Sequence, residues 1–71
     1  MVLRYVQDET KVIVKAGSGD MELSNANVIG NMIYGDLNGE YIQICTAPEP
    51  DGFFYGIFND GSRLQIIGTD N

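Results

Sequence analysis

The sequence lacks histidine and has a single cysteine, Cys45. Without histidine and a second thiol, neither the usual Cys/His zinc site nor an intramolecular disulfide can form. No histidine is present to activate the thiol as a nucleophile, so we expect Cys45 to be a small packed side chain. A lone thiol also suits a reducing compartment.

Long apolar runs are absent as well. No stretch approaches the roughly 20 apolar residues that a membrane-spanning helix needs. The first residues, Met1 to Tyr5, lack the apolar segment of a signal peptide. The sequence therefore predicts a cytoplasmic protein that does not act at a membrane.

Positive charge is scarce. The net charge is −6 over 71 residues, and from residue 16 onward eight acids are accompanied by one base, Arg63. Direct nucleic-acid binding normally requires clustered Lys and Arg, so we predict none. The acidic surface could instead occupy a basic surface of a target protein, as an acidic inhibitor or decoy would, or it could simply keep a small domain soluble. The residues expected to form it are Asp36, Glu40, Glu49, Asp51 and Asp60.

Short runs of β-branched and aromatic residues alternate with clusters of Gly, Asn and Asp, which is typical of strands and turns. We expect strands at residues 2–7, 10–16, 21–24, 28–34, 40–46, 53–58 and 62–67. Asn38-Gly39 and Asn59-Asp60-Gly61 are the strongest hairpin turns. The sequence thus predicts one all-β domain over residues 1–71, a small antiparallel barrel or sandwich of about 5–7 short strands, with residues 68–71 as a frayed tail.

Residues 12–39, which read VIVKAGSGDMELSNANVIGNMIYGDLNG, resemble a known strand–turn pattern. The pattern is that of bacterial putative-adhesin β-solenoids, in which GSGD-type turns follow short apolar strands. It is also similar to the β-structured tips of phage tail spikes. The resemblance covers less than half of the chain and implies Gly-turned β-structure, and no family function is carried over.

The acids do not form a recognisable metal or catalytic motif. Residues 36–40 (DLNGE) offer alternating oxygen atoms but lack the further ligands of an EF-hand loop. Glu49 and Asp51 flank Pro50 in a predicted loop, whereas glycosidase chemistry needs two carboxylates about 5–10 Å apart across a cleft. We predict no metal site, no cofactor and no catalytic residue, and therefore a protein that is not an enzyme.

The run Phe53–Phe58 (FFYGIF) is the most informative segment. Because strand side chains alternate between faces, Phe53, Tyr55 and Ile57 should point one way and Phe54 and Phe58 the other. Neither face carries a polar residue, so both should be covered, either within the monomer or by a partner. Gly56 would leave a gap between Phe54 and Phe58 that could admit a partner side chain or a ligand ring, or it could mark a bulge.

These features together predict a non-catalytic protein-interaction or assembly module that forms homo-oligomers or docks on another protein. A phage or bacterial accessory protein would fit this description. A small-ligand binder is a lower alternative, with its site between subunits because a chain of this size encloses little volume. The predicted interface residues are Phe53, Phe54, Tyr55, Ile57, Phe58 and Ile67.

Overall fold

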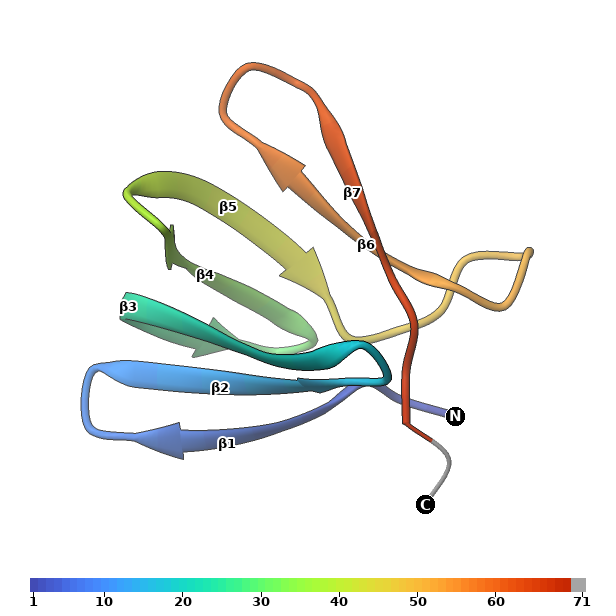
Figure 1. Ribbon diagram of the computed structural model, residues 1–71, viewed down its shortest axis with the longest axis horizontal. Coiled ribbons are helices and arrows are strands. Elements are labelled where there is room, and N and C mark those ends of the chain that lie inside the picture. Colours follow the sequence, from blue (N-terminus) through green and yellow to red (C-terminus); the bar gives the residue numbers. More distant parts are fainter. Residues whose placement is uncertain (70–71) are drawn as a thin grey trace.

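The computed structural model describes residues 1–69 and contains seven strands, each paired antiparallel with the next along the chain (Figure 1). The all-β antiparallel class is therefore confirmed. No part of residues 1–69 forms a helix that could cross a membrane. The strands are β1 (Arg4–Asp8), β2 (Lys11–Ala16), β3 (Gly19–Ile29), β4 (Met32–Leu37), β5 (Glu40–Cys45), β6 (Phe54–Phe58) and β7 (Arg63–Ile66).

The longest strand, β3, changes partner along its length. Its first half pairs with β2 and its second half with β4, and a register shift lies between Ser24 and Asn27. Asn25 has φ 48°, and the Ala26 N–H donates to the Thr10 carbonyl at 2.7 Å. The expected strand break at residues 25–27 was wrong: these residues form a bulge inside one strand, which bends the sheet.

The expected strand at residues 28–34 was also wrong. A two-residue turn at Gly30-Asn31, with Gly30 at φ 60°, separates the end of β3 from the start of β4, and Ile29 pairs with Met32 across it. The apolar run concealed this turn because both flanking strands are apolar. The Asn38-Gly39 hairpin turn is confirmed: the two residues have φ 53° and 86°, the left-handed values that such turns favour.

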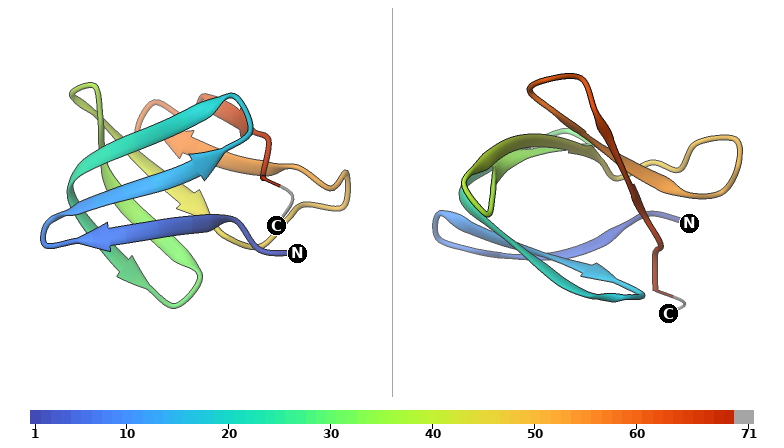
Figure 2. Two further views of the ribbon diagram at one scale, coloured as in Figure 1. Left: turned by 60° about the horizontal axis from the view of Figure 1, so that its bottom comes forward. Right: turned by 45° about the horizontal axis from the view of Figure 1, so that its top comes forward.

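The sheet curls like a barrel but does not close (Figure 2). The segment that follows β7 meets the β2–β3 hairpin at isolated contacts: Ala16 and Gly68 form an antiparallel bridge, and the Gly17 N–H donates to the Ile67 carbonyl at 2.7 Å. Gly68 therefore does not belong to a frayed tail, and residues 70–71 lie outside the described part of the chain. Antiparallel pairing throughout also differs from the coiled strands of a β-solenoid.

Side chains on the inner face of the curled sheet form one core. Val12, Val14 and Ala16 share this face, as do Ile42 and Ile44, and all five are buried because strand side chains alternate between faces. Leu3, which precedes β1, joins them because its N–H donates to the Thr46 carbonyl at 2.9 Å and holds the segment against the end of β5. The other buried apolar residues are Leu23, Ala26, Ile33, Phe54 and Ile66.

Candidate interaction surfaces

The two faces of β6 have different surroundings. Phe54 is completely buried, and Phe58 is half-buried and packs against the core. The expectation that Phe54 would meet a partner is therefore corrected, because the sheet curls round one core that encloses this ring. For Phe58, which keeps some exposure, the expected partner contact stays a prediction. The rest of the predicted interface lies on the outer face.

Gly56 does not leave a vacant gap. A Cβ built on Gly56 would lie 2.6 Å from Ile42 Cδ1 and 3.1 Å from Ile44 Cγ1, so these side chains of β5 already fill the space. The absence of a side chain at Gly56 therefore serves packing between β5 and β6. No pocket for a partner side chain or ligand ring opens there.

The other four predicted interface residues lie on the outer face, and we call them the outer patch: Phe53, Tyr55, Ile57 and Ile67. Phe54 pairs with Ile66, so Phe53 and Ile67, which flank this pair, share the face opposite the core. Ile57 and Ile67 are 49% and 53% exposed, Phe53 is 37% exposed, and Tyr55 is half-buried. Within residues 1–69 no second layer covers this side of β6 and β7.

Polar contacts hold Tyr55 in place within the outer patch. Its hydroxyl donates to Asp51 Oδ2 at 2.6 Å, and the Arg63 guanidinium lies over its ring, 4.0 Å from the centroid. The phenol and the Phe53 N–H, which donates to the same carboxylate at 2.9 Å, hold the pKa of Asp51 below its usual range. The same hydrogen bond raises the pKa of Tyr55. The arrangement orients a ring without creating an acid or base near neutral pH.

The predicted acidic residues serve different purposes. Asp60 accepts hydrogen bonds from the hydroxyl and N–H of Ser62, which lower its pKa and stabilise the β6–β7 turn. Asp36 is half-buried, whereas Glu40 and Glu49 are exposed. Within residues 1–69 no three acidic or cysteine side chains gather as a metal site would require. The acidic-decoy function stays a prediction, with Asp51 and Asp60 already engaged in their own loops.

A second outer surface was missed from the sequence. Ile29, Tyr34 and Tyr41 line a shallow hollow of about 350 Å³ together with Asn25 and Asn27. Tyr34 of β4 lies opposite Asn27 of β3. Asp36, two residues further along β4 and on the same face, lies opposite Tyr41 of β5. The period-two spacing of Tyr34 and Asp36 could have indicated their shared face, but the pairing of β3 with β4 could not be known.

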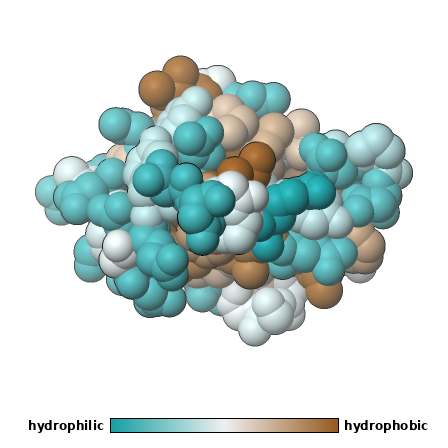
Figure 3. Space-filling model, turned by 90° about the horizontal axis from the view of Figure 1, so that it is seen from above, coloured by the Kyte–Doolittle hydropathy of each residue, from teal (hydrophilic) through white to brown (hydrophobic). Residues whose placement is uncertain are grey.

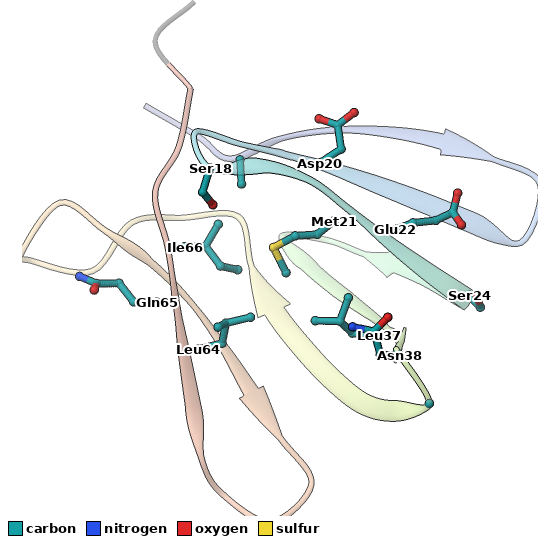
Figure 4. Close-up of a pocket in the computed structure, with 12 residues that line it drawn as sticks. Ser18, Asp20, Met21, Glu22, Ser24, Leu37, Asn38, Leu64, Gln65 and Ile66 are labelled. Atoms are coloured by element: carbon teal, nitrogen blue, oxygen red, sulfur yellow. The ribbon is translucent and has the colours of Figure 1, made fainter.

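A hollow of about 560 Å³ opens between β3 and β7, where the sheet fails to close (Figure 4). Met21, Leu37 and Leu64 point into it and are half-buried, while Asp20 and Glu22 lie at its rim and point away. Lys15 Nζ lies 2.9 Å from Asp20 and Lys11 Nζ lies 3.9 Å from Glu22, which partly neutralises this rim. From above, hydrophilic residues dominate the surface and hydrophobic ones show in separate areas between them (Figure 3).

Cys45 is half-buried at the end of β5, on the same face as Tyr41 and Gln43.

Comparison of the chain with protein-family models, with curated proteins and with solved structures finds no match.

Proposed function

We propose that this chain is a non-catalytic module that binds another protein through the outer patch. The observation that carries the proposal is an apolar face, Phe53, Tyr55 and Ile57, that the chain leaves partly or largely exposed although the opposite face of β6 packs against the core. Aromatic and branched apolar side chains of this kind form the centres of protein interfaces.

The local contacts around Tyr55 support this function. The hydrogen bond to Asp51 and the stacked Arg63 fix the ring orientation before any partner arrives, which reduces the side-chain entropy lost on binding. The surrounding charge favours a partner whose apolar contact surface is flanked by Lys or Arg. From residue 16 onward this chain has eight acids and one base.

Site-specific photocross-linking tests the proposal. A photoreactive residue replaces Ile57 in one variant and Glu9, an exposed turn residue of the β1–β2 hairpin, in a control. We expect one protein to be cross-linked in fixed proportion from position 57 and not from position 9. The purified partner should then bind the wild-type chain, and Ile57→Lys should weaken that binding by about tenfold or more.

Two results would contradict the proposal. One is equal cross-linking of unrelated proteins from both positions. The other is a purified partner whose affinity is unchanged by Ile57→Lys in a variant that keeps the far-ultraviolet circular dichroism of the wild-type chain.

A further inference from the structure

Among residues 1–69, the strand β1 forms one edge of the sheet and is paired with β2 alone. Its five residues (RYVQD) are all exposed, including Tyr5 and the 49% exposed Val6. Natural edge strands often avoid further pairing through proline, charged side chains or a bulge. Arg4–Asp8 has no proline and no bulge, its two charged residues stand at its ends and have opposite signs, and its pairing with β2 is regular over all five residues.

The free backbone groups of β1 can be assigned from its register. Asp8 pairs with Lys11 across a two-residue turn, so the backbone groups of these two residues hydrogen-bond to each other. In an antiparallel ladder every second residue is bonded in this way, so the backbone N–H and carbonyl groups of Val6 and Arg4 also point toward β2. The N–H and carbonyl groups of Tyr5 and Gln7 then point away from β2. Leu3 agrees with this alternation, because its N–H donates away from β2 to the Thr46 carbonyl.

We propose that two copies of the chain pair antiparallel through β1, about a two-fold axis at Val6. In this register Tyr5 lies opposite Gln7 of the second copy, and Gln7 opposite its Tyr5, so the outward backbone groups bond to each other. If the register between the two copies shifted by one hydrogen-bonded pair toward the N-terminus, the Leu3 N–H would have to bond to the second copy, but it already donates to the Thr46 carbonyl. A shift toward the C-terminus would require Glu9, a turn residue at φ 56°.

Charge selects the same register. With Val6 opposite Val6 of the second copy, Arg4 lies opposite Asp8 of the second copy, and the symmetry repeats this pair. Opposite charges at directly facing positions stabilise strand pairing and like charges oppose it. Within one chain Arg4 faces Lys15, a like charge. Arg4 already takes part in another interaction, and its five N–H donors allow a further one.

The side chains of the outer face are also compatible with this pairing. Val6 pairs with Ile13 of β2, so the two copies would bring two valines and two isoleucines together in one row. The ion pairs Lys15–Asp20 and Lys11–Glu22 continue this face on β2 and β3. The outer patch lies on β6 and β7, so this dimer stands independently of the proposed function and would display two outer patches.

Register-specific cross-linking tests the dimer. Val6→Cys, in a chain that also carries Cys45→Ala, should form an intermolecular disulfide under mild oxidation. The two thiols would meet at a non-hydrogen-bonded pair, where the Cα atoms lie about 4.5 Å apart. Gln7→Cys should form no such disulfide, because its thiol would face Tyr5 of the second copy. Ile57→Cys serves as a further control because Ile57 is as exposed as Val6. Equal cross-linking of Val6→Cys and either control would overturn the proposal.

Charge reversal provides a second test. Arg4→Asp or Asp8→Arg alone should weaken dimerisation at least about tenfold in sedimentation equilibrium, because each places like charges opposite each other twice. The double variant should recover most of this loss. A monomer at millimolar concentration for the wild-type chain, or a double variant that associates no better than the single ones, would overturn the proposal.

Amide hydrogen exchange separates the dimer from other association. Exchange of the Tyr5 and Gln7 amides should slow as concentration rises, whereas the Val6 amide, already bonded to β2, should change little. Ile57→Lys should leave this pattern intact even where it removes binding of another protein. Failure of the dimer and failure of the proposed function therefore give different results.

Discussion

At the scale of single residues, the inner glycines decide how closely neighbouring strands approach. Gly35 faces the Cβ atoms of Ala26 and Leu23, and a Cβ added there would lie 3.0 and 3.1 Å from them. Gly56 plays the same part between β5 and β6. The absence of a side chain at these positions is thus a packing requirement, which conformational preference in a strand would not reveal.

We expect Gly56→Ala to destabilise the fold by about 1–3 kcal/mol, because the added methyl group would overlap Ile42 in a filled core. The neighbouring exposed change Ile57→Ala removes three carbon atoms but should cost less than about 1 kcal/mol. Urea unfolding of both variants measures the difference. The packing explanation fails if Gly56→Ala is as stable as the wild-type chain.

The Asp51 carboxylate should titrate below the ordinary aspartate pKa of about 3.9. A lowered native pKa stabilises the fold above the unfolded-state value, and this contribution is lost as the pH falls through the native value. Tyr55→Phe removes the hydrogen bond from the phenol, which is the largest cause of the lowered pKa, so the pKa of Asp51 should move upward toward the ordinary value. Carboxyl chemical shifts followed by NMR between neutral and strongly acidic pH check both statements, and an unchanged midpoint in Tyr55→Phe would contradict them.

At the scale of elements, β6 combines a core face and an exposed face in consecutive residues. Phe54 and Phe53, which directly precedes β6, make a matched pair with the same side chain and different surroundings. Phe54→Ala should cost about 3–5 kcal/mol because it leaves a cavity in the core. Phe53→Ala should cost about 1 kcal/mol or less.

Thermal and urea unfolding of these two variants tests which face of β6 is structural. Stability losses of similar size would mean that the outer face also packs inside the molecule. Because a small domain has only about 5–15 kcal/mol of total stability, Phe54→Ala should also raise the unfolded fraction measurably.

At the scale of the whole molecule, contacts between segments that are not neighbours in the sheet hold it in its curled form. Leu3 lies outside every strand, yet it is buried and donates its N–H to Thr46 at the end of β5. Leu3→Ala should therefore cost about 2–5 kcal/mol, as for a central core residue. Val2→Ala, at the exposed neighbouring position, should change stability by about 0.5 kcal/mol or less, and comparable losses in both would contradict this account of the closure.

The antiparallel all-β class, the alternation that buries Val12, Val14, Ile42 and Ile44, and the Asn38-Gly39 turn could be predicted from the sequence. These features depend on local chemistry: the period of a strand and the tolerance of Asn and Gly for positive φ. The Asn25–Asn27 bulge and the Gly30-Asn31 turn could not be assigned correctly, because Asn and Gly suit bulges and turns equally and only strand pairing distinguishes them.

For the candidate site, alternation along residues 53–58 was enough to predict two apolar strand faces, and the composition was enough to show that basic residues are scarce. Which of these residues face the core could be seen only in the folded sheet. Phe54 and Phe58 pack against the core, whereas the outer patch lies on the opposite face. The physical reason is that alternation separates side chains into two sets without stating which set lies on the concave side of the sheet. That choice depends on the direction in which all seven strands curl together.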